Sequence, residues 1–558
     1  MPRGVTRVGA LVAVALFTTI APGLNPAVAV AQDGARPPWA PAGEPGSPPS
    51  DPGKPDKQYK QRVKCVQSGV EGHTTVSSNQ IQDIPWGQAH LRLDEVHDYV
   101  RAHSEHGKIG VNERTGKPLK VAVIDTGVTK HPYLQNRVTA GGDYVQSGDK
   151  GKNGLLDCDG HGTQVAGIIG ANPKNPDIGF IGVAPDVQII SIRQSSQNFS
   201  EKTEEEIKRE KEAARAKREA ARRQAEARKR QRENQQKIDE LQRELEKERQ
   251  NNDGGDTGAS QDSGQRTQGS SSGAGNQKTL AQAIVRAVNK HNVDVINMSV
   301  DACRPNTGST KPVSDEERML RAAVHYATER DVVVVAAAGN TGGACQQNGV
   351  PIQGDPRVTD PNEPRTIVTP PWFSEDLLAV GAIDATGSVA DFSMHGPWVS
   401  VAAPGTDIIS LDPAKGSSAL VNVMFEGKQA VRIQGTSFAA PYVAGLAVLV
   451  RQMHPELTAR EVMHRITTTA QHPGAGDGRD PFIGHGVINP MAALTMTLPE
   501  EIGAKPARDV ALPSSMPPPD NASPMPVIVA LAGSGGGLLA LGCTMFAVHT
   551  VRRNRAAA

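Results

Sequence analysis

Short apolar runs alternate with stretches of helical periodicity from about residue 84 to residue 498. The short runs rich in apolar residues, which predict buried strands, lie at 121–124, 187–192, 293–297, 332–337, 378–380 and 399–402. The stretches that predict helices lie at 165–169, 280–288, 316–328 and 437–453. Strands that are apolar on both faces and separated by helices are typical of a parallel sheet covered on each side. The pattern therefore predicts a layered α/β domain, with helices on both faces of a parallel sheet.

One long stretch, Glu201 to Gln250, interrupts this alternation. It consists mostly of Glu, Lys, Arg, Gln and Ala, which have good helix propensity and can form many i,i+4 ion pairs. Apolar residues are nearly absent, so the predicted helix has no face for a core. We expect a solvated charged helix, with a two-stranded coiled coil as the alternative.

The residues after this helix, 251–276, are rich in Gly, Ser, Asp and Gln and predict a flexible loop. Helix and loop together form an insertion, residues 195–279, within the α/β domain. Two interpretations of the insertion stay open, because a long excursion without a core of its own suits both. It is either a dispensable surface feature or a docking arm for a partner.

The N-terminus has the pattern of a secretory signal. Arg3 and Arg7 form a short positive region, and the apolar run at 8–20 is too short for an ordinary membrane span. Small residues follow at the spacing that a signal peptidase needs. We expect a signal peptide at residues 1–31, cleaved after Ala31, with an uncleaved anchor as the alternative.

A second apolar run, 526–551, contains no Asp, Glu, Lys or Arg and is long enough for a single transmembrane helix. Arg552, Arg553 and Arg555 follow directly, and positive residues stay on the cytoplasmic side of a membrane. Residues 552–558 are therefore expected to be a cytoplasmic tail. The folded part would lie outside the cytoplasm, on the periplasmic side, tethered to the cell membrane by a single-pass anchor.

Composition sharpens the boundaries between these parts. The 558 residues exceed what one ordinary core needs, and the 41 prolines and 57 glycines cluster before residue 60, at 251–276 and after residue 505. Proline-rich segments therefore flank the α/β domain, 84–498, as an N-terminal extension, 32–83, and a linker, 499–525. The beginning of this extension, up to about residue 60, is expected to be extended or disordered. A formal net charge of +0 gives no reason to expect nucleic acid as a partner.

Five cysteines occur, and Cys543 falls within the predicted membrane helix. The other four, Cys65, Cys158, Cys303 and Cys345, would lie in an oxidising compartment, where they allow three disulfide pairings. We favour Cys65 with Cys158 and Cys303 with Cys345. The second pair brackets a segment that we place next to the active site below.

No metal or cofactor is expected. The four cysteines are not close together in sequence, as zinc ligands usually are. Asp384, Asp391 and Asp407 do not form the dense loop of carboxylates that calcium prefers, and surface aspartates are the simpler interpretation.

Two short motifs carry candidate catalytic groups. The apolar strand 121–124 ends on Asp125, and catalytic groups gather at strand ends in open α/β sheets, although many strands end in this way. His161 lies between Gly160 and Gly162 directly before a helix. Glycines allow another part of the chain to approach closely, so this setting favours a functional histidine over an exposed or structural one.

Two further residues complete the set. Ser437 lies at the start of an apolar helix, where it is either an N-cap or a nucleophile whose backbone N–H faces a developing oxyanion. Asn340 follows the predicted strand 332–337. It is either an ordinary turn residue or an amide donor to the same oxyanion.

The order Asp125, His161, Asn340 and Ser437, with its surrounding sequence, resembles that of the subtilisin-like serine proteases of the peptidase S8 family. The segments that carry the likeness are VAVIDTG at 121–127, DGHGTQVAG at 159–167 and GTSFAAPYVAG at 435–445. IPWG at 84–87 also resembles the start of a mature catalytic domain of this type. The likeness covers about 84–498, apart from the insertion.

This resemblance implies a subtilisin-like parallel sheet, a protein or peptide substrate, and a role for each residue. Ser437 would attack the peptide carbonyl and His161 would act as general base. Asp125 would orient the histidine and stabilise its charged form. Asn340 and the Ser437 N–H would bind the oxyanion.

The whole layout resembles the mycosins, the membrane-anchored subtilisin-like proteases of type VII secretion systems. The shared features are the signal peptide, the proline-rich extension, the extracytoplasmic cysteines, the linker and the C-terminal helix. This resemblance implies a partner, the type VII secretion membrane complex. It also implies that the extension wraps the catalytic domain rather than acting as a removed inhibitor, and a Cys65–Cys158 bridge would hold it near His161.

One feature departs from the subtilisin pattern. Where subtilisins usually continue with Leu-Gly-Gly after Ser299, this chain has Val300, Asp301 and Ala302. The substrate pocket is therefore expected to be altered. Asp301 would favour a basic or polar substrate residue if it faces the pocket, which the sequence leaves open.

Together these features predict a membrane-anchored, extracytoplasmic serine endopeptidase of narrow specificity, associated with a type VII secretion system. The alternative is a mainly structural subunit that stabilises the secretion membrane complex, with proteolysis secondary.

Overall fold

The computed structural model describes residues 40–41, 43–71, 76–77, 80–148, 153–245, 273–306, 313–349, 364–475, 478–501 and 525–555. The chain divides into two compact units, Met1–Met496 and Thr497–Ala558, which are described separately. The predicted signal peptide, 1–31, lies outside the described residues, as do most of the loop at 251–276 and most of the linker at 499–525.

A seven-stranded sheet forms the centre of the first unit, with strand order β15-β14-β12-β10-β5-β7-β6. Its strands are β5 Lys120–Asp125, β6 Val138–Asp143, β7 Gln188–Arg193, β10 Val295–Met298, β12 Val333–Ala337, β14 Leu378–Ile383 and β15 Val399–Pro404. Every neighbouring pair in the sheet is parallel. The predicted parallel sheet is therefore confirmed.

Helices cover both faces of this sheet. The helices are α1 Trp86–His90, α2 Leu93–His103, α3 His161–Gly170, α5 Gln277–Arg286, α6 Asp315–Glu329, α7 Thr436–Met453, α8 Ala459–Thr468 and α9 Pro490–Thr495. Val121 and Val123 of β5 pack in one core with α2, α3, α7 and α8, whereas Ala122 and Ile124 pack in a second core with α5 and α6. Alternate residues of a strand point to opposite faces, so a strand between two cores is apolar throughout.

The sequence did not predict several short strands. β6, which contains Gly141 and Gly142, lacks a continuous apolar run and lies at one edge of the main sheet. Strands outside the main sheet that were not predicted include β3 Val76–Ser77, β4 Gln80–Ile81, β11 Ala302–Pro305, β13 Thr366–Thr369, β16 Ser410–Leu411, β17 Leu420–Val421, β18 Val423–Glu426 and β19 Gln429–Arg432. These strands are two to four residues long, too short to show a period of their own.

The N-terminal extension is attached to the domain along residues 43–71. Its strand β1, Tyr59–Gln61, pairs with β8, Ser196–Glu201, and its strand β2, Gln67–Gly69, pairs with β18. Asp51 forms an ion pair of 2.9 Å with Arg286. The segment has few regular elements, as its composition predicts, but these contacts give it a defined path rather than disorder.

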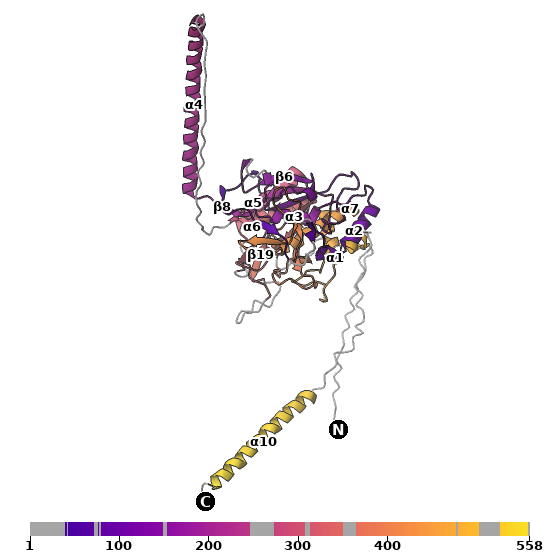
Figure 1. The fold of residues 1–558 in the computed structure, drawn as a ribbon. Coiled ribbons are helices and arrows are strands. Elements are labelled where there is room, and N and C mark those ends of the chain that lie inside the picture. The colour runs from indigo at the N-terminus through magenta and orange to yellow at the C-terminus, as the bar shows by residue number, and fades with distance from the viewer. Residues whose placement is uncertain are drawn as a thin grey trace, which may run out of the picture. The chain divides into compact units, whose positions relative to one another are not determined.

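The insertion leaves the domain between two paired strands, β8 and β9, Gly273–Ala274. Between them, the charged helix α4 extends from Glu204 to Leu245, which confirms the predicted helix (Figure 1). Its side chains from Lys208 to Lys229 are all exposed. A helix with no apolar face has nothing to bury, so the exposure follows from its sequence.

In the second unit, helix α10 extends from Met525 to Arg555. Within the ranges that the structure describes, we found no helix with the length and apolar character that crossing a membrane requires.

Candidate active site

The four residues singled out in the sequence lie at or just beyond strand ends, or at the start of helices, at the carboxyl end of the sheet. Asp125 is the last residue of β5, and Asn340 comes three residues after β12. His161 is the first residue of α3 and Ser437 the second residue of α7. Because the strands are parallel, their carboxyl ends share one edge of the sheet, where groups from distant parts of the chain can meet.

Two hydrogen bonds connect three of these residues into a chain. Asp125 Oδ1 lies 2.8 Å from His161 Nδ1, and His161 Nε2 lies 2.8 Å from Ser437 Oγ. A carboxylate only accepts, so Nδ1–H donates to Asp125 and leaves Nε2 to accept from the serine hydroxyl. The arrangement can draw a proton from Ser437 to His161.

The Asp125 carboxylate is fully buried, and its Oδ1 also accepts from the Thr126 N–H at 2.7 Å. Burial by itself lowers the pKa of the His161 imidazole. The charge and hydrogen bond of Asp125, together with the charges of Asp157 and Asp159, raise this pKa by more in sum, so the net shift is upward. His161 keeps about a quarter of its side chain exposed, which leaves it open to a substrate.

Close backbone packing explains the glycines on either side of His161. A Cβ on Gly162 would lie 2.2 Å from the Gly127 carbonyl oxygen, a distance that real side chains do not adopt. Gly160 has φ +84, in the left-handed region that favours glycine. The glycines therefore allow the His161 segment to approach Asp125, as the sequence predicted.

Asp157 is a buried carboxylate that sequence reasoning missed. Its Oδ1 accepts from the Thr126 hydroxyl and the Gly160 N–H, both at 2.8 Å, and its Oδ2 accepts from the Thr163 N–H at 2.8 Å and hydroxyl at 2.6 Å. Burial raises the pKa of Asp157 to about 6. Asp157 thus ties the segment after Asp125 to the segment that carries His161. A carboxylate four residues before the histidine was the available signal.

Ser437 is not the N-cap of α7, which removes one of the two interpretations made from its sequence. The cap position belongs to Gly435, and it has no side-chain cap bond. Ser299, the residue after β10, donates its hydroxyl to the Ser437 carbonyl at 2.7 Å. This contact fixes the first turn of the helix and was not predicted.

Asn340 is oriented by its neighbour in the serine motif. Its Oδ1 accepts from the Thr436 N–H at 2.9 Å and from the Thr436 hydroxyl at 3.1 Å. Because the oxygen is held in this way, the amide NH2 is directed elsewhere. Within the described part of the chain, Nδ2 donates no hydrogen bond, so both of its hydrogens are available to a ligand.

Both favoured disulfides are present. Cys65 and Cys158 are joined by a bond of 2.00 Å, and Cys303 and Cys345 by a bond of 2.03 Å. Cys158 lies three residues before His161, so the first bridge attaches the N-terminal extension beside the site.

Among the described residues, Asp301, Cys303 and Cys345 are the group with metal-like spacing, but the two sulfurs are bonded to each other and cannot act as thiolate ligands. Asp384 accepts hydrogen bonds within its own turn, and Asp407 pairs with Arg432.

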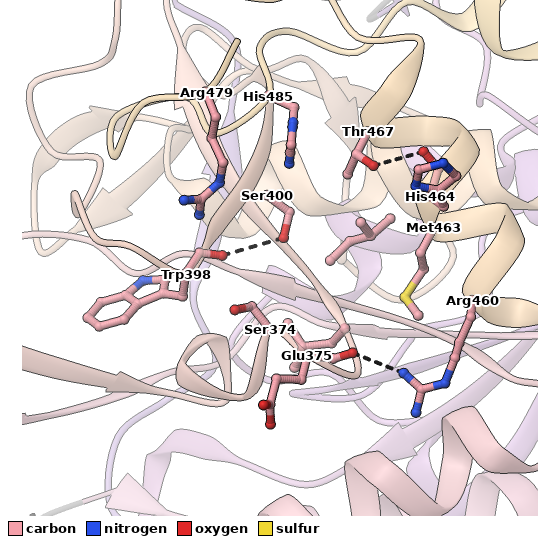
Figure 2. Close-up of a pocket in the computed structure, with 12 residues that line it drawn as sticks. Ser374, Glu375, Trp398, Ser400, Arg460, Met463, His464, Thr467, Arg479 and His485 are labelled. Atoms are coloured by element: carbon pink, nitrogen blue, oxygen red, sulfur yellow. Dashed lines mark hydrogen bonds between the residues drawn. The ribbon is translucent and has the colours of Figure 1, made fainter. Parts of the chain in front are cut away.

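A pocket of about 410 Å³ lies elsewhere on the first unit (Figure 2). Leu378 and Ser400, at the amino ends of β14 and β15, line it together with Arg460 and His464 of α8. Arg460 is already paired with Asp376 at 2.6 Å and Glu329 at 2.9 Å. None of the four predicted catalytic residues lines this pocket.

Comparison with known proteins agrees with this geometry. A family model described as the subtilase family, peptidase S8, matches residues 116–486. Mycosin-1 of Mycobacterium tuberculosis is 36% identical over 500 residues, which cover 88% of this chain and 90% of that protein. The chain belongs to the mycosin family of subtilases.

Solved structures of mycosins resemble this one along most of their length. The crystal structure of MycP1 from the ESX-1 type VII secretion system is 34% identical, covering 83% of this mycosin and 97% of that chain with a TM-score of 0.59. A chain in an intact ESX-5 inner membrane complex is 35% identical, covering 92% of this mycosin and 99% of that chain with a TM-score of 0.61. This mycosin is accordingly a subtilisin-like serine protease.

Proposed function

We propose that this mycosin is a membrane-anchored, extracytoplasmic serine endopeptidase of narrow specificity, associated with a type VII secretion system, and that Asp125, His161 and Ser437 are its catalytic triad. The observation that carries the proposal is the hydrogen-bonded chain in which His161 lies 2.8 Å from both Asp125 and Ser437. Its substrates are proteins or peptides.

The triad has one role for each residue. Ser437 Oγ attacks the scissile carbonyl while His161 Nε2 takes the hydroxyl proton. His161 then gives this proton to the leaving amine. Asp125 holds the Nδ1–H tautomer and stabilises the imidazolium that forms between these two transfers. The raised pKa of His161 fits this role, because the Asp125 carboxylate favours the charged histidine.

Asn340 and the first turn of α7 stabilise the negative charge that develops on the substrate. The amide NH2 of Asn340 and the backbone N–H of Ser437 donate to the oxyanion of the tetrahedral intermediate. Thr436 supports this role because it holds Asn340 Oδ1 and so sets the direction of the amide. Donors that are fixed before the reaction need no reorganisation as the charge develops.

The location rests on the two ends of the chain. The pattern at 1–31 supports export, and the uncharged run at 526–551, followed by arginines, supports a single membrane span with residues 552–558 in the cytoplasm. The two disulfides support an oxidising compartment for the catalytic domain. The domain would therefore work on the periplasmic side of the cell membrane.

A second function is favoured by one comparison. Chains 35% identical to this mycosin form part of the ESX-5 inner membrane complex and of its periplasmic assembly, and they match 92% and 86% of this chain. By analogy, this chain would stabilise a secretion membrane complex, with proteolysis secondary. The exposed charged surface of α4 suits such a role.

One genetic comparison separates the two functions. A strain with Ser437→Ala and a strain lacking the whole protein are compared for secretion, and the purified variant is tested for peptide cleavage. If proteolysis dominates, both strains lose secretion. If assembly dominates, Ser437→Ala still secretes and only the deletion fails. Wild-type cleavage by purified Ser437→Ala would contradict the catalytic assignment itself.

A further inference from the structure

Asp301 lies in the short segment that connects two anchored points of the site. Two residues before it, Ser299 donates its hydroxyl to the Ser437 carbonyl at 2.7 Å. Two residues after it, Cys303 is bonded to Cys345, five residues beyond Asn340. The position of Asp301 is thus held from both sides relative to the nucleophile and the proposed oxyanion donor.

The carboxylate of Asp301 faces the segment that carries Asn340. Its Oδ2 lies 2.9 Å from the position that a Cβ would take on Gly339. A carboxylate oxygen of Asp301 and the two sulfurs of the Cys303–Cys345 bridge lie within 4.8 Å of one another. The sequence left open which way this side chain faces, and these contacts place its carboxylate against the segment that carries Asn340.

The charge of this carboxylate is only partly compensated by the protein. Burial raises the pKa of Asp301 above its ordinary value, and the N–H groups of Asn340 and Asp301 and the charge of His161 offset only part of this shift. In the part of the chain that the structure describes, no Lys or Arg forms an ion pair with Asp301. The residue also keeps an exposed face. A carboxylate packed on one side and open on the other can accept a cation from outside.

We propose that Asp301 is a specificity-determining residue that binds the Lys or Arg side chain of the substrate residue immediately before the scissile bond. The proposal rests on the proposed function, because it assumes that Asn340 and Ser437 hold the scissile carbonyl. The side chain of that residue is attached to the α-carbon, which is bonded to the carbonyl carbon, so it begins beside the Gly339–Asn340 segment. A long cationic side chain can then reach the carboxylate.

Other side chains fit this position less well. An apolar side chain would take water away from the Asp301 carboxylate and give no hydrogen bond in return, and an acidic one would be repelled. A hydrogen bond between two charged groups corresponds to about 10- to 100-fold in binding. The Cys303–Cys345 bridge keeps the carboxylate and Asn340 on linked segments, which favours one length of side chain over others.

The test uses three peptidyl diphenyl phosphonate probes that differ only in the residue bonded to phosphorus, with Lys, Leu or Glu side chains. These probes label an active serine directly, and the second-order labelling rate measures recognition without turnover. For the full-length wild-type protein, the Lys probe is expected to react about 10- to 100-fold faster than the Leu probe, and the Glu probe slowest.

Three variants complete the experiment. Asp301→Asn is expected to lose the preference for the Lys probe, so that the ratio of the Lys and Leu labelling rates approaches one. Asp301→Lys is expected to prefer the Glu probe. Asp177→Asn, an exposed carboxylate beyond the C-terminal end of α3, is the matched control and should keep the wild-type order.

The outcomes distinguish this inference from the proposed function. Equal labelling by all three probes in the wild type, or an unchanged preference in Asp301→Asn, overturns the role of Asp301 and leaves the protease assignment intact. Labelling of Ser437→Ala, or no labelling of the wild type by any probe, overturns the proposed function and this inference together.

Discussion

The loops around Ser437 are held by contacts between distant segments of the chain, whereas the helix α4 is held by contacts between near neighbours. In the loops, Asp157 alone accepts four hydrogen bonds that join two segments of the chain, and the His161 side chain is held by Asp125 from another element. In α4, the ion pairs that the structure shows beyond Glu210 are local, such as Arg222 with Glu226 at 2.9 Å.

This difference teaches where a single substitution should matter. A residue in the loops contributes to contacts between distant segments, so its loss disturbs geometry that no neighbour can restore. A residue in α4 contributes mainly helix propensity and exposed pairs, each worth a few tenths of a kcal/mol. The predictions below test this contrast, from the largest expected effect to the smallest.

The largest effect is expected for Asp125→Asn. Asparagine keeps the size of the side chain but removes the charge that fixes the His161 tautomer, so kcat should fall by about 10⁴-fold, as in other serine triads. Steady-state kinetics of peptide cleavage would measure this fall in kcat. Asp391→Asn, an exposed carboxylate, is the control and should keep full activity. A loss below tenfold in Asp125→Asn would contradict the triad.

The second effect concerns Asn340. Asn340→Ala should lower kcat by roughly 10²–10³-fold, the size known for this type of donor in subtilisin, with little change in KM. Asn340→Asp retains an oxygen for Thr436 but replaces the NH2 donor, so it should fold normally and still lose kcat. If Asn340→Asp has wild-type kcat, the residue is structural and not an oxyanion donor.

The third effect is on stability. Replacing Cys65 and Cys158 together with Ser removes a bridge across 93 residues of sequence and should cost about 2–4 kcal/mol in the free energy of unfolding. Thermal or denaturant unfolding of the first unit, followed in the full-length protein, measures this. Cys543→Ser changes a free, exposed cysteine and should leave the unfolding midpoint unchanged. An equal effect of both changes would contradict a structural role for the bridge.

The fourth effect is on pH dependence. His161 must be neutral to act as base, and its pKa is raised above 6.5, so activity should fall about tenfold per pH unit below a midpoint higher than 6.5. Removing the carboxylate in Asp125→Asn should move the midpoint of the residual activity to lower pH. The sign for stability is opposite, because the Asp125–His161 pair stabilises the fold at low pH and this contribution is lost as pH rises through the raised pKa. A midpoint that rises in Asp125→Asn would contradict this account.

The smallest effect is expected for α4. Replacing residues Ala213 to Ser270 with a short Gly/Ser loop keeps β8 and β9, which are already paired where the insertion leaves the domain. The free energy of unfolding should change by less than about 0.5 kcal/mol, and small-peptide cleavage should not change. Secretion by the same variant separates the two interpretations of the insertion. Normal secretion fits a surface excursion, and lost secretion fits a docking arm.

The same contrast explains which parts of the structure were predictable. The strands β5, β7, β10 and β12 were predicted because each lies in a short run rich in apolar residues, and α4 because propensity and charge pattern act locally. The path of residues 43–71 did not follow from periodicity, although the resemblance to the mycosins implied that the extension wraps the domain. Its strand β2 pairs with β18, more than 350 positions away, and two or three residues carry no periodicity of their own.

The sequence by itself determined the alternation of strands and helices, the identity and order of the groups at Asp125, His161, Asn340 and Ser437, and the exposure of α4. Only the tertiary structure decided that Asp157 joins the catalytic loops, and that the Asp301 carboxylate faces Asn340. The reason is physical. Periodicity and propensity act between near neighbours, whereas the direction of a loop side chain depends on partners that folding brings from distant parts of the chain.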